Sequence, residues 1–383
     1  MPIYRITMRN FKPVILLIFL FNLFTVDLFA QKDNTLLTSL KKHSDQVHSV
    51  SFSPDGNQFI SGSKDESIII WDFALLEPIT QLKRHYATIY ELEYSNDGKY
   101  FFSGGDKTIN VWNTDGTYVK SLSGHSTSVW SVGLSRNADY LVSGSFDNNF
   151  RLWDIAEGKT LHVFENNKKS VLAVAFSEAN NLIACGSQDG SIEIYTFDNF
   201  ELIHTFSGHG SNIYSLDFSN DGKYLASSSR DNNIKIWDLE KMEIFHVLTK
   251  HERSVMSVKF SSNDHYLVSG SYDASVIIWD VKTGEDIYTF LGHSLPVNDV
   301  DISNDNRYIL SASSDNSINL WEIKPELLIE FYFNDEFQKE LNDSKLFEPK
   351  NGSESRTEYK ERQVKAENYK KEIIQKYMDR LNR

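Results

Sequence analysis

Cysteine and proline are scarce in this sequence: Cys185 stands alone, and 383 residues include seven prolines. A single cysteine excludes an internal framework of disulfide bonds. The motifs of common catalytic sites are also missing, because there is no Gly-x-Ser-x-Gly, no His-Glu-x-x-His, no phosphate-binding loop and no Cys-x-x-Cys. The sequence therefore predicts no enzyme, no metal site and no cofactor.

Basic residues are also in deficit, with 39 Lys and Arg against 53 Asp and Glu and a formal net charge of −14. Residues 1–33 carry +2 and residues 334–383 carry +1, which leaves −17 on the central region. Binding to phosphates needs clustered Lys and Arg, so nucleic acid is not an expected partner. An acidic surface favours solubility and basic partners.

What the sequence has in abundance is apolar and aromatic residues, at 40% and 13%, which suits a globular all-β protein with a large core. The clearest stretch is 206–238, where three β-rich runs, 212–218, 223–228 and 233–237, are separated by turn residues. Such an arrangement predicts a meander of three strands, and 201–206 supplies a fourth.

This stretch recurs seven times, and its closing aromatic residues are 41 or 42 positions apart. Most copies also hold an opening His and a turn Asp. The repeated set is His43, Asp65 and Trp71; His85, Asp106 and Trp112; His125, Asp147 and Trp153; Asp189 and Tyr195; His209, Asp231 and Trp237; His251, Asp273 and Trp279; His293, Asp315 and Trp321.

A period of this length with Gly-His and Trp-Asp ends resembles the WD repeat, so the chain is similar to a seven-bladed WD-repeat β-propeller over roughly residues 34–322. The resemblance implies four strands per blade. It also implies a hydrogen-bonded chain of His, Asp, Trp and a Ser in each blade, completed in the fifth copy by Ser227 or Ser229. The repeated His and Asp are then structural, not catalytic or metal-binding.

The fourth copy departs most from the pattern, with Asn167 in place of His, Cys185 near the usual Ser, and Tyr195-Thr196 in place of Trp-Asp. Drift in a tolerant blade is one interpretation and a reactive thiol is the other. No His or basic residue adjoins Cys185 in sequence, so nothing evident would lower the pKa of its thiol.

Both ends of the repeat region offer an outer strand for the last blade. Residues 34–43 resemble such a strand before any blade has begun, and Leu327–Phe333 falls where the other copies have theirs. We favour the N-terminal segment, which would close the ring, and leave the second segment to begin a helix or add an edge strand. The propeller is expected to occupy 34–333.

The tail, 334–383, is rich in Glu, Lys and Arg. Five apolar residues at spacings of three to five predict a helical stripe: Val364, Tyr369, Ile373, Tyr377 and Leu381. Such a helix could be solvated, docked on the propeller, or used in assembly.

The family resemblance also implies a binding surface. The variable position after a β-branched residue of the first strand faces the mouth of the central channel, where peptides commonly bind. A second variable position, before the turn Asp, lies near the same face. The two series are His48, Tyr90, Trp130, Leu172, Tyr214, Met256 and Asn298, and Lys64, Gly105, Phe146, Gln188, Arg230, Tyr272 and Ser314.

Aromatics, Met and Arg are typical of protein-binding hot spots. The expected partner-binding residues are therefore His48, Tyr90, Trp130, Phe146, Tyr214, Arg230, Met256 and Tyr272. Their rings could instead fold back between blades and fill the core. The expected function is an exported scaffold that binds a protein or peptide. The alternative is an exported enzyme or a small-ligand sensor that uses the same mouth. The oligomeric state is left open.

Residues 1–30 predict a secretory signal peptide. Arg5, Arg9 and Lys12 precede the apolar run Val14–Val26, and Ala30 offers a cleavage point. This run is short for a spanning helix, which needs about 20 residues. An uncleaved membrane anchor at residues 11–30 is the alternative. In either case the propeller is expected outside the cytoplasm, in a periplasmic or extracellular location.

We expect the native protein to begin at Gln31 and to be recovered outside the cytoplasm. N-terminal sequencing of protein purified from its own cells measures this directly. A soluble cytosolic chain that retains Met1 would contradict the prediction.

Overall fold

The computed structural model of the chain describes residues 35–165, 169–177 and 179–381. It divides into Met1–Thr35 and Leu36–Arg383. The expected signal peptide and Asn167 lie outside the described residues. Within the described part, none of the helices combines the length and the apolar character needed to cross a membrane.

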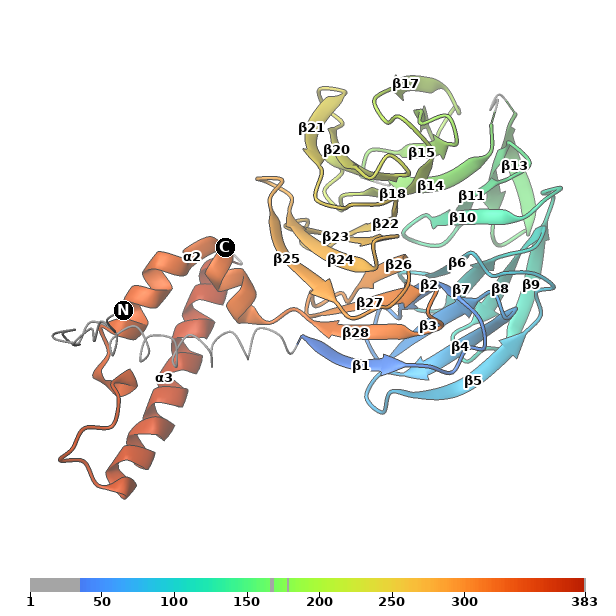
Figure 1. The fold of residues 1–383 in the computed structure, drawn as a ribbon. Helices are drawn as coiled ribbons and strands as arrows, with labels where there is room; N and C mark the ends of the chain where they lie inside the picture. The colour runs from blue at the N-terminus through green and yellow to red at the C-terminus, as the bar shows by residue number, and fades with distance from the viewer. Residues whose placement is uncertain (1–34, 166–168, 178, 382–383) are drawn as a thin grey trace, which may run out of the picture. The chain divides into compact units, whose positions relative to one another are not determined.

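In Leu36–Arg383, the described strands form seven antiparallel sheets of four strands, arranged as blades around a central axis (Figure 1). The blades, numbered 1 to 7, are β2 Val47–Phe52, β3 Gln58–Ser63, β4 Ser67–Asp72 and β5 Glu77–Lys83; β6 Glu91–Tyr94, β7 Tyr100–Gly104, β8 Thr108–Asn113 and β9 Tyr118–Ser123; β10 Val129–Leu134, β11 Tyr140–Ser145, β12 Phe150–Asp154 and β13 Lys159–Phe164; β14 Val171–Ser177, β15 Leu182–Ser187, β16 Ile192–Thr196 and β17 Leu202–Phe206; β18 Ile213–Phe218, β19 Tyr224–Ser229, β20 Ile234–Asp238 and β21 Glu243–Leu248; β22 Val255–Phe260, β23 Tyr266–Ser271, β24 Ser275–Asp280 and β25 Asp286–Leu291; β26 Val297–Ile302, β27 Tyr308–Ser313, β28 Ile318–Glu322 and β1 Leu36–Leu40.

The expected meander in the fifth repeat is confirmed, since its three runs become β18, β19 and β20. The turn between β18 and β19 depends on Gly222, whose φ of +73° is a conformation that few other residues adopt at low cost. Ser219 Oγ donates a hydrogen bond to Asp221 in the same turn, at 2.8 Å.

The hydrophobic core lies between neighbouring blades. The cluster between blades 2 and 3 is typical, because Ile109 and Val111 of one blade meet Val129 and Leu141 of the next, all buried. A single sheet cannot cover both of its apolar faces, so each blade depends on the two beside it.

The ring is closed by β1, as favoured from the sequence. It pairs antiparallel with β28, from Leu36 opposite Trp321 to Leu40 opposite Ile318. Leu36 also packs against the core between blades 6 and 7, and Leu40 against the core between blades 7 and 1. The last blade therefore joins strands from the two ends of the propeller sequence.

The competing segment Leu327–Phe333 forms part of a helix, α2 Pro325–Asn342. The helix therefore begins before residue 333, the expected end of the propeller. The short 3₁₀ helix η1 Lys345–Phe347 and the helix α3 Arg356–Leu381 follow. Figure 1 shows α2 and α3 side by side.

The tail is docked, which is one of the three possibilities left open by the sequence. Ile373 and Tyr377 of α3 are buried with Phe337 of α2. Met378 packs against the core between blades 6 and 7, where the Tyr332 hydroxyl also donates to Asp280. All five residues of the expected stripe lie on α3, and Val364 is 62% exposed while Ile373 and Tyr377 are buried.

Deleting Leu36–Leu40 should open the ring while leaving the His43 network of blade 1 in place. We expect a loss of about 3 kcal/mol or more from the lost ladder and exposed core. In a chain of this size that lowers the melting temperature by roughly 5–10 °C.

Deleting Arg356–Arg383 is the comparison, since it uncovers α2 but leaves every blade complete. Melting followed by tryptophan fluorescence, which reports the blades, should then change less than for the strand deletion. An equal or larger shift for the α3 deletion would show that β1 is not what holds the ring.

Candidate functional site at the channel mouth

The repeated His, Asp and Trp residues form a hydrogen-bonded chain with a Ser of the second strand. In blade 1, His43 Nδ1 lies 3.0 Å from Asp65, and His43 Nε2 lies 2.8 Å from Ser61 Oγ. Ser61 Oγ also accepts a hydrogen bond from Trp71 Nε1 at 2.8 Å. Blades 3, 5, 6 and 7 repeat this arrangement, and in blade 5 the Ser is Ser227.

Each of these hydrogen-bonded networks contains the Ser, His and Asp of a catalytic triad, but a substrate cannot reach it. Ser61 is 0% exposed, and its oxygen already accepts the indole N–H. Burial alone would raise the pKa of Asp65, but hydrogen bonds from His43, Ser67 and the Ser44 backbone hold it well below its usual range. The carboxylate is thus fixed as an internal acceptor.

Blade 4 replaces this chain with another. Glu193 accepts a hydrogen bond from the Tyr195 hydroxyl at 2.6 Å, and the Cys185 thiol donates to the same carboxylate at 3.9 Å. Burial and the adjacent Glu193 charge raise the pKa of Cys185 well above its usual value. The thiol is therefore held in its unreactive form, which favours drift in a tolerant blade.

The expected mouth residues share a backbone feature that the sequence did not reveal. In six of the seven described inner strands, pairing is interrupted by a β-bulge at this position, between Val129 and Ser131 in blade 3, for example. A bulged residue is unpaired and its side chain is redirected. Of the residues at these bulges, His48, Trp130, Tyr214 and Met256 line the channel.

Four of these side chains form one aromatic cluster over blades 1 to 3. Ring centroids lie 5.6 Å apart for His48 and Tyr90, 4.6 Å for Tyr90 and Trp130, and 5.1 Å for Trp130 and Phe146. Burial, with a contribution from Lys64, lowers the pKa of His48 to about 4, so its ring is neutral near pH 7. Phe146 is 36% exposed.

The rest of the series divides by exposure. Tyr214 and Met256 line the channel and are half-buried, while Tyr272 and Arg230 are exposed nearby. Leu172 and Asn298 are buried, and Asn298 donates to the carbonyl of Val47 at 2.8 Å, which seals blade 7 against blade 1. In the second series, Lys64 is exposed, Gln188 and Ser314 are half-buried, and Gly105 is buried.

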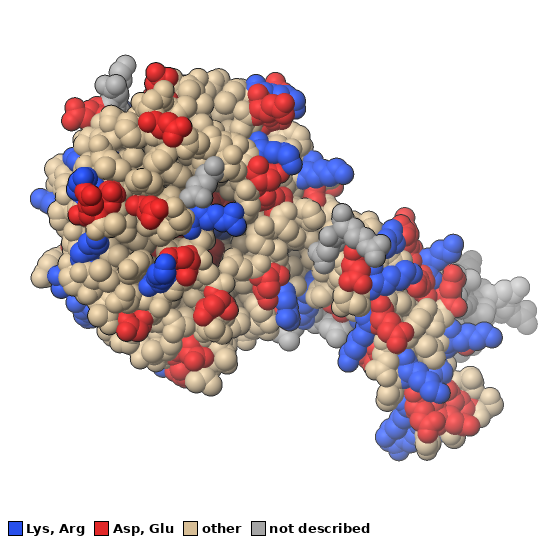
Figure 2. Space-filling model, turned by 180° about the vertical axis from the view of Figure 1, so that it is seen from behind, with Lys and Arg blue, Asp and Glu red and all other residues tan. Residues whose placement is uncertain are grey.

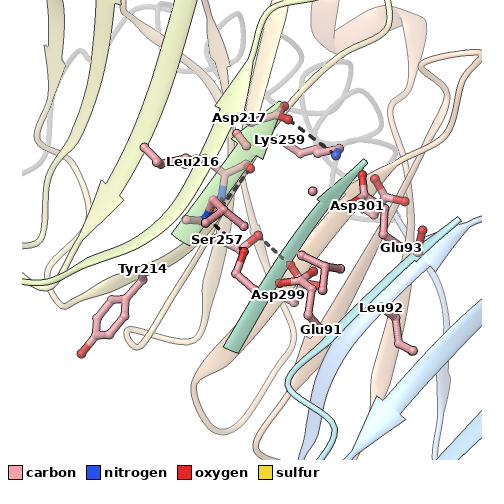
Figure 3. Close-up of a pocket in the computed structure, with 18 of the residues that line it drawn as sticks. Glu91, Leu92, Glu93, Tyr214, Leu216, Asp217, Ser257, Lys259, Asp299 and Asp301 are labelled. Atoms are coloured by element: carbon pink, nitrogen blue, oxygen red, sulfur yellow. Dashed lines mark hydrogen bonds and ion pairs between the residues drawn. The ribbon is translucent and has the colours of Figure 1, made fainter. Parts of the chain in front are cut away.

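Behind the mouth lies a cavity of about 160 Å³ with a charged lining that the sequence reading missed. Figure 3 shows two layers of side chains in this channel, with Glu91 and Asp299 in one and Glu93, Asp217, Lys259 and Asp301 in the other. These residues alternate along the inner strands, so they share the channel-facing side. That alternation was the available signal.

Five carboxylates thus face one lysine among the described lining residues. Lys259 Nζ lies 3.6 Å from Asp217 Oδ1. Over the described residues, no group of three or more His, Cys, Asp or Glu is placed to hold a metal ion. Elsewhere the surface is mixed in charge: Figure 2 shows Lys and Arg spread singly over the propeller face in view and both signs dense on the C-terminal helices.

The channel carboxylates make stability depend on pH. Burial raises the pKa of Glu93 to about 7, Lys259 opposes this rise, and neighbouring aspartates add to it. A carboxyl group whose pKa is raised by folding contributes stability below its unfolded pKa, near 4.5, and loses it as the pH rises through the folded value.

Glu93→Gln should therefore stabilise the protein by about 1–3 kcal/mol at pH 8 and have no effect at pH 4. Denaturant unfolding at both pH values tests this, with Glu201→Gln on the exposed side of blade 4 as the control. A destabilised Glu93→Gln protein at pH 8 would contradict the assignment.

Comparisons with known proteins agree with this architecture. Residues 148–323 match the family model of the first β-propeller domain of WDR3, and residues 34–72, 76–113 and 116–154 match the model of the WD domain, G-beta repeat. Together these matches run through all seven blades.

Among curated relatives, the nuclear distribution protein nudF of Aspergillus flavus is 36% identical over 130 residues, which are 33% of this chain and 29% of that protein. Subunit I of eukaryotic translation initiation factor 3 from Schizosaccharomyces pombe is 38% identical over 61 residues, 16% of this chain and 19% of that protein. The small ribosomal subunit protein RACK1y of Oryza sativa is 29% identical over 131 residues, which are 34% of this chain and 32% of that protein.

The chain thus spans less than a third of the length of the first of these relatives. The family models, the relatives and the blade geometry all lead to one conclusion. The chain belongs to the WD-repeat β-propeller family.

Proposed function

We propose that this propeller is a non-enzymatic scaffold that binds another protein or a peptide at its channel mouth. One observation carries the proposal: the aromatic cluster of His48, Tyr90, Trp130 and Phe146 lies at the mouth of the channel. Phe146 is exposed and the other three residues are half-buried, so part of this aromatic surface is open to a partner. Aromatic residues dominate the binding energy of protein interfaces.

Two further facts support a scaffold. The repeated Ser, His and Asp groups are used up in buried hydrogen-bonded chains, which leaves none of them for catalysis at the mouth. The names of two relatives, an initiation-factor subunit and a ribosomal subunit protein, place those proteins in larger assemblies. Export is also part of our proposal, and it is supported by the sequence pattern of residues 1–33 alone.

An exported enzyme or small-ligand sensor is the second candidate, favoured by the channel cavity and its carboxylates. Screening the purified protein for hydrolytic and ligand-binding activity, with and without divalent metals, separates the two. Turnover of a small substrate that is lost on blocking the channel would favour the second candidate.

We expect Trp130→Ala combined with Tyr214→Ala to abolish partner capture. The two substitutions remove aromatic surface from blade 3 and from blade 5 at the mouth. Loss of the stacking of Trp130 on Tyr90 should cost about 1–2 kcal/mol of stability, which leaves the propeller folded. The measurement is affinity purification from native cell extract with mass spectrometry, alongside melting curves.

Leu75→Ala is the matched control, because Leu75 is 73% exposed in the turn between β4 and β5, at the opposite end of its blade. Proteins captured by the wild type should also be captured by this variant. Capture that survives the double substitution would show that the site lies elsewhere.

A further inference from the structure

The channel-facing residue nearest the mouth has a structural task in most blades. It accepts a hydrogen bond from a backbone N–H of a neighbouring blade's inner strand, and so ties the two blades together. In each pair the backbone N–H is named first and the accepting side-chain oxygen second: Leu92 and Ser49 at 3.0 Å, Val174 and Ser131 at 3.2 Å, Val258 and Ser215 at 3.4 Å, Val300 and Ser257 at 3.3 Å, and Val50 and Asp299 at 3.0 Å.

Glu91 occupies this position in blade 2 and does not perform that task. Its carboxylate forms no hydrogen bond or ion pair with the described residues, and its side chain lines the channel and is partly exposed there. Burial, and then the nearby charges of Asp299 and Glu93, raise the pKa of Glu91 well above its usual value.

On the mouth side of the channel, no positively charged side chain among the described lining residues lies beside the Glu91 carboxylate. Asp299 shares its layer and is already bonded, to Ser49 and to Ser257. The channel's lysine, Lys259, lies in the far layer beside Asp217, as Figure 3 shows. A positive group that enters from the mouth would therefore meet negative charge before it met Lys259.

The entrance to this layer is aromatic. Tyr90 directly precedes Glu91 in the chain and stacks on Trp130 at 4.6 Å. The faces of such rings attract ammonium and guanidinium groups, and the attraction is larger where water is excluded. The cavity of about 160 Å³ has room for the end of one side chain.

We propose that the channel receives a cationic side chain, a Lys ammonium or Arg guanidinium presented by the partner's peptide, and that Glu91 is its counter-ion. This inference rests on the proposed function, because it specifies what the bound partner places in the channel. The argument is charge complementarity: an unpaired carboxylate lies behind aromatic rings, in a channel where carboxylates outnumber cations.

The test uses capped peptides Gly-Gly-X-Gly-Gly in which X is Arg, Lys, citrulline or Leu. Citrulline keeps the shape of Arg without its charge. Isothermal titration calorimetry and tryptophan fluorescence should show binding of the Arg or Lys peptide and about tenfold or weaker binding of the citrulline peptide. Glu91→Gln should reduce binding of the cationic peptide about tenfold, and Glu201→Gln should not.

Proton release gives a readout that a structural role for Glu91 would not produce. A bound cation favours the ionised carboxylate and so lowers the pKa of Glu91. Binding to the wild type should therefore release protons, seen as a dependence of the binding enthalpy on the buffer's ionisation enthalpy. Glu91→Gln should reduce this dependence.

The outcomes separate this inference from the proposed function. If Glu91→Gln leaves partner capture and peptide binding intact while the Trp130 and Tyr214 double variant loses capture, the mouth binds but the channel cation is wrong. If the double variant still captures the partner, the proposed function itself fails. Equal binding of the Leu and Arg peptides, no binding of the Arg peptide at millimolar concentration, or competition by Mg²⁺ or Ca²⁺ would each overturn the inference.

Discussion

Ring closure is the constraint on which the rest of this structure depends. Each blade covers its apolar faces only against its neighbours, so one open joint would leave two faces exposed to water. The pairing of β1 with β28 closes that joint through a strand distant in sequence from the three others of its blade. This pairing adds to the contacts between blades 7 and 1, such as the hydrogen bond from Asn298 to the Val47 carbonyl, that hold the ring and its central channel together.

Much of the fold could be predicted because the repeat encodes it locally. The His, Asp and Trp positions recur with fixed spacing, and each set forms its hydrogen bonds within one blade. The choice of Ser227 over Ser229 could not be predicted, because both lie on β19 and only the three-dimensional path of the chain selects one. The helical stripe of α3 was predictable, but not how much of it is covered: Val364 is exposed and Ile373 is buried.

The candidate site was predictable only in part. The variable positions of the inner strands were identified, but Leu172 and Asn298 are buried, so the mouth is an aromatic arc over some blades and not a complete ring. The bulges that redirect these side chains leave no mark in the residue types. The channel carboxylates were overlooked because Glu91 and Glu93 alternate with apolar residues, as solvent-facing residues of an ordinary half-buried strand would.

The positions of Glu91 and Glu93 also bear on why the channel is acidic. At the equivalent places other blades use Ser49, Ser51 and Asp301, which accept hydrogen bonds from neighbouring strands and so help to hold the ring. Neither glutamate does this, and both are destabilising once ionised, because partial desolvation in the channel and the neighbouring carboxylates raise their pKa values. Ring stability alone would therefore be served better by a serine in each place. A bound cation would compensate the charge of Glu91 and so explain why a residue that lowers the stability of the free protein is present there. The aromatic entrance beside Glu91 is suited to admit a cation.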